Sequence, residues 1–563
     1  MRQWHVVLFL LCVSAPGFAA EPETCARAHA LADDALAVAG FDDLRRAAAA
    51  VPVPAGAQLR AIRYVRQNVF PDEDYWLARQ ANRFNFLTSR RALGAALPFA
   101  EGDRVSAAEI AEAERILRAK PYLYDAVILV RERCPDGVAL DVVTRDVWTL
   151  TPGIGVSRSG GDNETSASLA DVNFLGTGKS LSLEVFDDRD RSGAFVSYTD
   201  PNVSGSRWAG RLVAAENDDG QRYSVSLTRP FFSLDTRFAL GLQASHFVRE
   251  QDLEFLGEDR FELDAETDAA SVFVARSGGR DGGWIHRQFL GYRFLDEVIE
   301  FPAAFPGATR IERRFAYPYV GWQWFEDRFE ERTDLRRVGV TEDVQLGWSS
   351  YAELGWSSDD TGGDGEYVLA RGTASYRRFV RNRHLLSVSA ELQGRYDLDR
   401  NRSEDVLAEV TGTLLWEQAP RWRFATSVRY VHTENLPLDR QLTLGGDTGL
   451  RGYPSRYQPG DRSFLVTLEQ RYYSGARVFG LLRVGYAAFL DVGRAWFDDE
   501  APTWLPPRDG DHFDTLANVG FGLRLESIRT RRDRVFHIDI ARPLVDGPEV
   551  KTWEITLSGK QRF

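Results

Sequence analysis

Three charged residues in the last quarter of the chain have the types and spacing of a buried ion cluster. Arg451 lies in the glycine-rich segment LGGDTGLRGY, residues 444–453, and such a segment can fold tightly and approach other backbone closely. Asp491 and Glu469 lie on the polar faces of two alternating segments. A guanidinium shared by two carboxylates forms forked, charge-assisted hydrogen bonds. We expect this contact to fix the loop inside a water-restricted space; the alternative is that Arg451 is a solvated loop charge.

Sequence signatures of catalysis are missing. GTGKS at 176–180 imitates the end of a phosphate-binding loop, but Asn173 stands where that loop needs glycine, and a strand-like segment follows where it needs a helix. The chain has no G-x-S-x-G, and its eight histidines form no H-E-x-x-H. We therefore predict no enzyme activity, no cofactor and no metal site. The formal charge of −13 argues against nucleic acid as the main partner.

Residues 1–20 are typical of a secretory signal peptide. Arg2 is their only charge, an apolar run covers residues 4–13, and small residues near Ala20 offer cleavage sites. The run is too short to span a bilayer. Leu11 disfavours a lipoprotein signal at Cys12, because that processing needs a small residue there. A buried first helix is the less favoured alternative.

Two cysteines, Cys25 and Cys134, remain after removal of this segment. Low cysteine usage fits an exported chain, in which an unpaired thiol is a liability. The two cysteines can form a disulfide, or they can remain free buried thiols.

The chain up to residue 150 indicates an arm followed by a small α/β unit. Residues 21–58 are alanine-rich and predict a helical arm, which ends at the breaker VPVPAG. Residues 59–150 predict the order strand, helix, helix, strand, strand. The second helix opens at Ser106, and Glu109 three residues later completes a capping box. The expected strands are AIRYVRQNVF, YDAVILV and VALDVVTRDVWTL.

From residue 151 to 563 the sequence alternates residue by residue in short segments, as at 222–229, 386–393 and 553–562. Alternation places one face in lipid and the other in a polar lumen, and an aromatic fraction of 12% suits the interfacial girdles of such a barrel. A large soluble all-β protein also fits this composition. At roughly 25 residues per strand with its connector, we expect about 16 strands. The chain ends inside a strand at Phe563.

Four motifs, in order, resemble the BamA/TamA-type outer-membrane assembly and secretion superfamily. Residues 157–183 resemble its first barrel hairpin, 444–453 its inward-folding loop tip, 466–473 a strand with an inward glutamate, and 489–493 its Phe-x-Asp-x-Gly strand. The turn residues of the first motif are Asn173, Leu175, Gly176 and Gly178. The residues of the other three are Arg451, Gly452, Tyr453, Glu469, Phe489, Asp491 and Gly493.

The resemblance implies a fold and a function. Residues 59–150 would be one POTRA domain in the periplasm, and residues 151–563 an outer-membrane β-barrel of a Gram-negative bacterium. Phe563 would belong to the assembly signal. Segments 153–159 and 553–563 would form a lateral gate. Independently of the resemblance, we hypothesise that Cys25 and Cys134, the only cysteines after the signal peptide, form a disulfide that ties the arm to the POTRA domain.

The expected function is that of a translocase or insertase. Its expected partners are the outer-membrane lipid bilayer, unfolded outer-membrane or secreted polypeptides, and accessory periplasmic or lipoprotein partners. The alternative is a passive structural or pore-forming barrel that keeps the scaffold without translocation.

Overall fold

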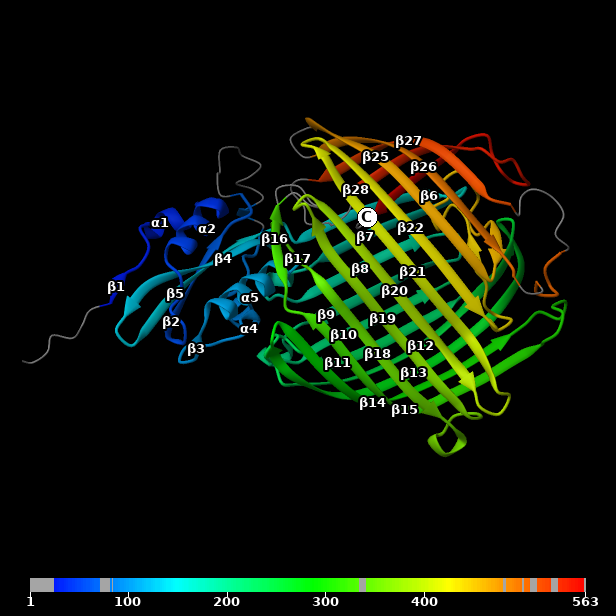
Figure 1. The fold of residues 1–563 in the computed structure, drawn as a ribbon, viewed down its shortest axis with the longest axis horizontal. Coiled ribbons are helices and arrows are strands. Elements are labelled where there is room, and N and C mark those ends of the chain that lie inside the picture. Colours follow the sequence, from blue (N-terminus) through cyan, green and yellow to red (C-terminus); the bar gives the residue numbers. More distant parts are fainter. Residues whose placement is uncertain are drawn as a thin grey trace, which may run out of the picture.

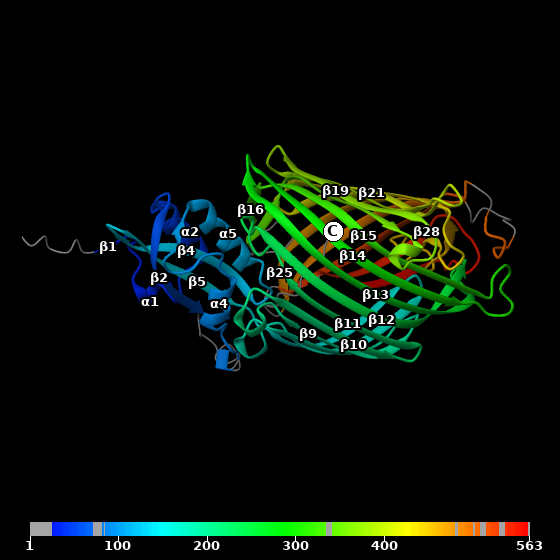
Figure 2. The ribbon, with the colours of Figure 1, turned by 90° about the horizontal axis from the view of Figure 1, so that it is seen from below.

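The structure is a computed structural model that describes residues 25–70, 82–83, 85–333, 341–478, 482–498, 501–506, 514–527 and 535–560. The expected signal peptide and Phe563 lie outside these residues. Figure 1 shows a small α/β domain at one end of a wide β-barrel, and Figure 2 shows the same arrangement from below. Among the described residues, no helix is long and apolar enough to cross a membrane.

The α/β domain is built on one five-stranded sheet of order β1-β4-β5-β2-β3. Strands β4 and β5 form an antiparallel hairpin, and β2 runs parallel to β5. The elements are β1 (Ala26–Arg27), α1 (Asp33–Leu36), α2 (Phe41–Ala50), β2 (Ala57–Gln67), α4 (Arg90–Ala96), β3 (Arg104–Val105), α5 (Ala107–Arg118), β4 (Leu123–Cys134) and β5 (Gly137–Asp146).

Helix α5 begins at the predicted capping box. The Ser106 side chain accepts from the Glu109 backbone N–H, and the Glu109 carboxylate accepts from the Ser106 N–H. Ile110, Ala113 and Leu117 are buried on one face of the helix, at the spacing that places residues on the same side of an α-helix. This face packs into the main core of the domain.

The alanine-rich segment belongs to the domain and is not a separate arm. Phe41 and Leu44 of α2 are buried against Val127 and Leu129 of β4 and Val143 of β5. The helix therefore covers the sheet face opposite α5. Because alanine dominates the helix, the two large side chains Phe41 and Leu44 make most of its contact with the sheet. The boundary expected near residue 58 thus separates two parts of one domain.

Within the described residues the barrel is closed and contains 20 strands, so the expected number of about 16 is wrong. Six of the strands lie within residues 150–229 and are only 8 to 10 residues long, joined by connectors of two to eight residues. An average spacing of roughly 25 residues per strand undercounts such a region. In contrast, β13 alone has 24 residues.

The barrel strands run antiparallel to their neighbours. They are β6 (Leu150–Ser159), β7 (Asp162–Asp171), β8 (Ser180–Asp187), β9 (Ser192–Asp200), β10 (Ala209–Asn217), β11 (Gly220–Arg229), β12 (Phe238–Phe255), β13 (Glu258–Asp281), β14 (Trp284–Glu300), β15 (Arg310–Glu326), β18 (Gly347–Ser357), β19 (Tyr367–Val380), β20 (His384–Asp397), β21 (Arg402–Ala419), β22 (Trp422–Glu434), β25 (Arg462–Val478), β26 (Leu482–Trp496), β27 (Leu516–Ser527), β28 (Val535–Pro543) and β29 (Glu554–Lys560).

Two short hairpins lie outside this barrel sheet. Strands β16 (Phe329–Thr333) and β17 (Thr341–Gln345) project from the end that faces the α/β domain, here called the near end. Strands β23 (Leu442–Leu444) and β24 (Gln458–Gly460) belong to the connection at the opposite, far end.

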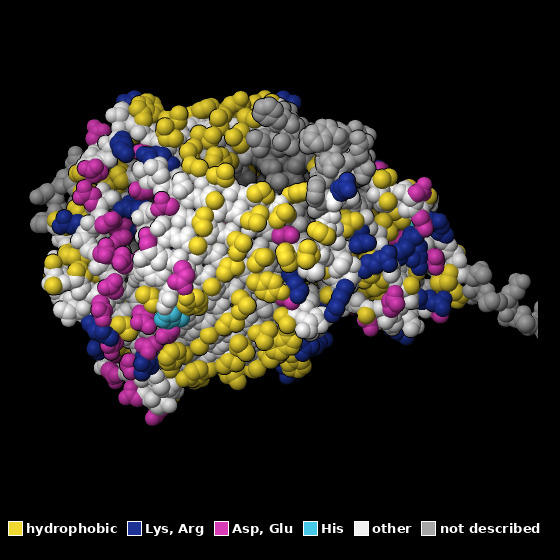
Figure 3. All heavy atoms as spheres, turned by 180° about the vertical axis from the view of Figure 1, so that it is seen from behind, with side chains coloured by type: hydrophobic (Ala, Val, Ile, Leu, Met, Phe, Trp, Pro, Cys, Tyr) yellow, Lys and Arg dark blue, Asp and Glu magenta, His cyan; other side chains and the backbone are white. Residues whose placement is uncertain are grey.

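The outer face of the barrel is apolar over its middle. Large side chains such as Ile154, Leu212 and Leu290 are more than half exposed there. Figure 3 shows apolar side chains spread over the barrel face, and acidic and basic side chains gathered at the far end. Such a belt is characteristic of a barrel whose outer surface is covered by lipid.

Candidate functional site

The connection between β22 and β25, residues 435–461, folds into the barrel from the far end; we call it the inner loop. Leu450, Tyr453 and Tyr457 of this loop are completely or almost completely buried. They pack with Leu444 and with wall residues of β25, β26 and β27. The Tyr453 hydroxyl donates to the Ala517 carbonyl at 2.9 Å. An apolar cluster therefore holds the loop that carries Arg451.

Arg451 lies at the centre of a buried ion cluster on the inner wall. It donates from Nε and Nη2 to the two carboxylate oxygens of Asp491, both at 2.9 Å. Its Nη1 donates to Glu469 Oε2 at 3.1 Å and to Asp539 Oδ2 at 3.0 Å. Arg451 is 3% exposed. The structure thus brings together Arg451, Asp491 and Glu469, the three residues that the sequence singled out.

Asp539 and two further arginines complete the cluster, and sequence reasoning missed all three. Arg524 of β27 donates to Asp539 Oδ1 at 2.5 Å and lies 3.0 Å from Glu469 Oε2. Arg471 of β25 donates to Glu469 Oε1 at 2.8 Å. Three buried carboxylates thus face three buried guanidinium groups. This balance matters, because an unpaired charge in such a place is costly.

Phe489 and several glycines pack closely around the Arg451 ion cluster. The Arg451 guanidinium carbon lies 3.3 Å from the centre of the Phe489 ring, a cation–π arrangement. Phe489 fits over Gly520, where a Cβ would overlap the ring. A Cβ on Gly452 would lie 2.8 Å from the Cβ of Asn518. Gly493 lies against Leu444 at the base of the loop.

Asn518 of β27 is the remaining polar residue beneath the loop tip. Its Nδ2 donates to Asp491 Oδ2 at 2.8 Å, and its Oδ1 accepts from the Gly452 N–H at 3.2 Å. The side chain therefore links the loop backbone to the same carboxylate that Arg451 binds.

The opposite side of the inner loop contacts the first barrel strands. The Ser455 N–H donates to the Gly160 carbonyl at 3.1 Å, and the Ser159 hydroxyl donates to the Gly446 carbonyl at 2.9 Å. Arg456 binds Asp190 in the β8–β9 turn at 2.7 Å and also binds Glu254 of β12. The loop therefore bridges the last strands, which bind Arg451, and the first strands.

The seam between β29 and β6 lies under this bridge and is weakly paired. Within the described residues these strands share one register pair, Leu557 with Arg158. Their other neighbours pair far more extensively, with seven pairs between β28 and β29 and ten between β6 and β7. One ion pair also crosses the seam, from Arg158 Nε to Glu554 Oε1 at 3.4 Å. Among the described residues, the seam is therefore the least extensively paired junction of the barrel wall.

The predicted turn of the first hairpin lies at the near end, against the α/β domain. Asn173 Nδ2 donates to Thr88 Oγ1 at 2.9 Å, and Asn173 Oδ1 accepts from the Gly178 N–H at 2.7 Å. The Ser89 N–H donates to the Gly176 carbonyl at 2.8 Å. This turn therefore joins the barrel to the domain.

The Thr88 side of this junction is also buried. Thr88 donates from its backbone N–H and its hydroxyl to Asp146 Oδ2, at 2.6 and 2.8 Å. Burial raises the pKa of the Asp146 carboxyl to about 6. The junction is thus a buried polar chain from Asp146 through Thr88 to Asn173.

A second contact between domain and barrel is ionic. Arg118 at the end of α5 binds Asp343 through Nε at 2.8 Å and Nη2 at 2.6 Å, and it binds Glu331 at 2.7 Å. Arg280 in the barrel binds Glu112 of α5 at 2.5 Å. Arg115 stacks on Phe329 at 3.9 Å. Helix α5 is therefore docked on the β16–β17 hairpin and the neighbouring turns of the near end.

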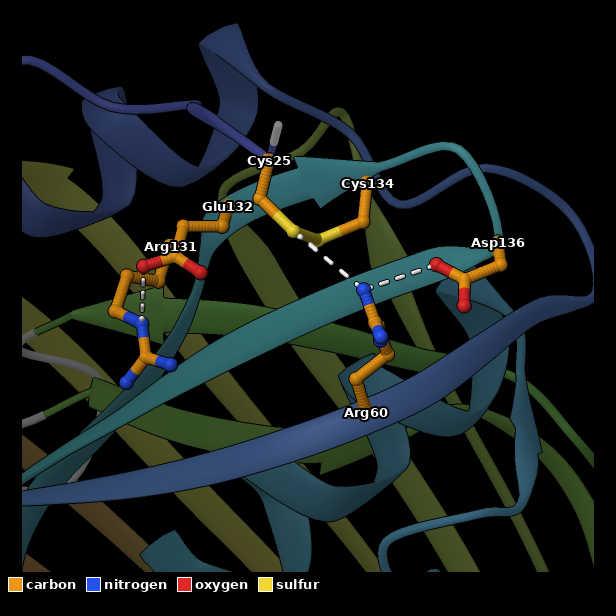
Figure 4. The surroundings of a disulfide bond; sticks show 6 residues. All are labelled: Cys25, Arg60, Arg131, Glu132, Cys134 and Asp136. Carbon is orange, nitrogen blue, oxygen red and sulfur yellow. Dashed lines mark hydrogen bonds and ion pairs between the residues drawn. A yellow bond between two sulfur atoms is a disulfide. The ribbon is translucent and has the colours of Figure 1, made fainter. Parts of the chain in front are cut away.

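Cys25 and Cys134 form a disulfide in the structure. Figure 4 shows the bond beside Arg60, which pairs with Asp136 at 3.0 Å. The bond joins the segment of β1 to the end of β4, where Ala26 pairs with Arg133. It therefore closes the N-terminal segment onto the α/β sheet.

Replacing both cysteines with serine is expected to destabilise the α/β domain and to leave the barrel intact. The bond joins residues 109 apart in the sequence, and closing a loop of that length contributes up to about 4–5 kcal/mol in the chain-entropy model. The measurement is the urea concentration at which β4 and β5 become cleavable by protease. Reduction of the wild type should reproduce the shift, and it should not affect the double variant. Free alkylation of both thiols in the unreduced wild type would contradict the bond.

Two other groups of acidic, histidine or cysteine side chains lie close together within the described ranges. One is Cys25, Glu132 and Cys134, whose sulfur atoms are already bonded to each other. The other is His246, Glu266 and Asp268, where His246 Nδ1 lies 2.9 Å from Asp268 Oδ1. Neither group contacts the inner loop in the described contacts.

Comparisons with known proteins give no family model and no curated protein that matches this chain. Solved structures do match. BamA from Haemophilus ducreyi lacking POTRA domains 1–3 has 15% identity and a TM-score of 0.40, with 89% of this chain and 84% of that chain covered. CdiB from Acinetobacter baumannii has 13% identity and a TM-score of 0.44, with 89% and 73% covered. CdiB from Escherichia coli has 13% identity and a TM-score of 0.45, with 97% and 92% covered. Likenesses at this level assign no function.

Proposed function

We propose that the chain is an outer-membrane translocase or insertase for polypeptides, with a lateral gate between β6 and β29. The observation that carries this proposal is the single register pair at the seam, bridged from inside by the inner loop. The activity needs no covalent chemistry. It needs an edge that can open and groups that hold it closed.

An open seam would expose unpaired backbone N–H and C=O groups inside the membrane. Such groups are costly in lipid, and an incoming strand satisfies them by pairing with the free edge. Few hydrogen bonds need to break at this seam, since the described strands share one pair. Insertion by strand addition is therefore energetically more accessible here than between any well-paired neighbours.

The inner loop sets the energy of the closed state. Opening the seam moves β6 away from β29 and strains the contacts that the loop makes with both sides. Those contacts are Arg451 with the last strands and Ser455 with Gly160. The loop thus holds the two sides of the seam together, and these contacts would break when the seam opens.

The α/β domain offers a place for substrate in the periplasm. Strand β2 pairs with β5 along one side, and on its other side it pairs with β3 at Ala57 and Gln58. Leu59 of that edge already bonds to Gly102 and Asp103, and the Ile62 N–H donates to Glu101 Oε1. The part of the edge beyond Ile62 is therefore the part that suits an extended polypeptide added by β-augmentation. A permanently open pore fits the structure less well, because the loop lies within the barrel and the domain is docked at the near end.

A disulfide across the seam tests the gate. Cysteines at Arg158 and Leu557, the paired positions, are expected to block function when oxidised and to restore it when reduced. The matched control joins Ile540 and Ile555, a register pair within the permanent β28–β29 contact, which should not affect function. Function is measured as the outer-membrane and secreted proteome of cells that depend on the variant.

The wild type treated with the same reductant controls for loss of the bond between Cys25 and Cys134. Full function of the oxidised seam variant, with cross-linking shown on gels, would rule out lateral opening. Steady conductance in planar bilayers, unchanged by the cross-link, would favour the passive pore.

A further inference from the structure

A small apolar cavity lies outside the barrel, at the junction with the α/β domain. Its volume is about 210 Å³. The walls come from the domain, the start of β6 and the β7–β8 hairpin with its turn. The lining side chains used below are Asn85, Phe86, Leu150, Leu169, Leu175 and Leu183.

The apolar residues of this cavity are unusually exposed. Phe86 is 60% exposed and Leu175 is 55% exposed. Leu175 also has a positive φ of 53°, which L-residues other than Asn, Asp and Gly seldom adopt. A large apolar side chain in a strained and uncovered position is unfavourable in water. A covering group would remove that cost.

The β9–β10 hairpin has a turn of the same backbone shape that lacks these features. Ser204 has a φ of 54° and stands where the first turn has Leu175. Asn202 and Asn173 both precede their turn with nearly the same φ, −145° and −143°. The backbone shape is therefore shared, and it does not by itself require leucine.

Asn85 supplies a polar group within the same cavity. Its side-chain Nδ2 is buried and has no hydrogen-bond partner in the described part of the chain. A buried donor left without a partner is unfavourable, because it has lost its hydrogen bonds to water. The cavity thus combines apolar walls with one unsatisfied donor, which calls for a ligand that has an apolar chain and an oxygen acceptor.

The cavity also opens onto the surface that lipid covers. Leu169 of β7 pairs with Leu183 of β8, and Leu183 pairs with Val196 of β9. All three are exposed on the outer face of the barrel, and two of them line the cavity. The cavity therefore continues the apolar belt toward the near end, at the level of the inner-leaflet headgroups if that end faces the periplasm.

We propose that this cavity binds one glycerophospholipid of the inner leaflet. An acyl chain covers Leu175 and Phe86, and an ester or phosphate oxygen accepts a hydrogen bond from Asn85. The site lies beside the first strand of the seam, since β6 contributes Leu150 to its wall. Bound lipid would therefore support the strands that the proposed gate must move, although lipid binding itself does not depend on that gate.

Photolabelling of the full-length protein in vesicles tests the site. The probe is phosphatidylethanolamine with a diazirine within the first few carbons of one acyl chain, close to the ester. Labelled peptides are expected to include residues 85–86 and 174–175. Leu175→Asn should lower this labelling by about three- to tenfold. The exposed half of the leucine side chain gains transfer free energy when the acyl chain covers it, and asparagine loses that gain. Asparagine tolerates a positive φ, so the turn should be preserved.

The matched control is Ser204→Asn, at the same backbone position of the second turn, which should leave the labelling unchanged. Labelling at Leu290, on the open lipid face of β14, is the internal reference. Asn85→Ala should also reduce retention of added phosphatidylethanolamine in native mass spectrometry. Labelling at 174–175 that equals the reference and does not respond to Leu175→Asn would overturn the proposal. Cross-links from this cavity to a polypeptide, with lipid absent, would overturn it in favour of a substrate or partner protein.

Discussion

Replacing Arg451 with alanine is expected to release the inner loop while the barrel stays folded. The substitution removes four hydrogen bonds, two to Asp491 and one each to Glu469 and Asp539. It leaves three buried carboxylates facing two guanidinium groups. Removing one partner from a well-buried ionic group costs about 3–5 kcal/mol, and less where water enters. The barrel keeps its backbone ladders, so the loss falls on the loop.

The measurement combines limited proteolysis with heat-modifiable migration on gels. Cleavage within residues 435–461 should rise strongly in Arg451→Ala, while the heat-modifiable shift should persist. Function should fall, because a free loop no longer sets the closed state of the seam. Arg451→Lys should rescue poorly, because an ammonium cannot make the forked contact with Asp491. Arg429→Ala is the matched control, since Arg429 pairs with Glu409 on the barrel wall and is more exposed.

A double-mutant cycle identifies the contact itself. Asp491→Asn should resemble Arg451→Ala, and the double variant should be little worse than either single variant. The coupling is not complete, because Asp491 also binds Asn518 and Arg451 also binds Asp539. Strictly additive defects would show that the two side chains do not interact in the working protein.

The family resemblance of the loop and strand motifs predicted the central contact of this cluster, and sequence alternation agreed with it. Strand period two places Glu469 and Asp491 on polar faces without knowledge of the fold. It could not predict that Asp539 and Arg524 meet them, because that depends on the register of β27 and β28. A shift of one residue in register moves every side chain of a strand to the other face. Long-range register is set by the whole barrel and not by the local pattern.

The same dependence on long-range contacts explains why the predicted strand number and the predicted N-terminal arm were wrong. Strand number depends on the length of strands and connectors. The short strands and connectors from β6 to β11 take fewer residues per strand than the average that we assumed. The alanine-rich segment shows weak helical patterning, because Leu36, Phe41 and Leu44 are its only large apolar side chains that are buried among the described residues. The docking of α5 was not predictable, since Arg118 and Asp343 are 225 residues apart in the sequence. Local patterns predicted the elements; only the folded chain defines their partners.

Replacing Arg118 with glutamate is expected to undock helix α5 from the β16–β17 hairpin at the near end of the barrel. The Arg118 side chain is only 3% exposed and binds Asp343 and Glu331. It also lies 3.8 Å from Glu114. Burial raises the pKa of Glu114 to about 7, and Arg118 acts in the opposite direction. The substitution would replace this shared cation with a fourth carboxylate.

The expected cost exceeds that of simple truncation. Removing the partner of a buried ion pair costs about 3–5 kcal/mol, and repulsion between like charges adds to it. Arg280 keeps Glu112, Arg45 lies 3.8 Å from Glu331, and the Asn173–Thr88 junction is unchanged, so the loss is expected at the Arg118 end of α5. Hydrogen exchange should therefore rise in the β16–β17 hairpin and at the end of α5. The core strands β4 and β5 should keep their protection, because the domain has its own core.

Two variants separate undocking from general damage. Arg46→Glu changes the same charge on the exposed face of α2, where Arg46 pairs only with Asp43 in the described contacts, and it should alter neither exchange nor function. Arg118→Glu combined with Asp343→Arg restores an opposite pair at the interface and should recover much of the protection. Function should follow docking if substrate passes from the domain to the seam. Unchanged exchange in the β16–β17 hairpin of Arg118→Glu would show that the ionic contact does not hold helix α5 in place. Lost docking with full function would show that substrate transfer does not require it.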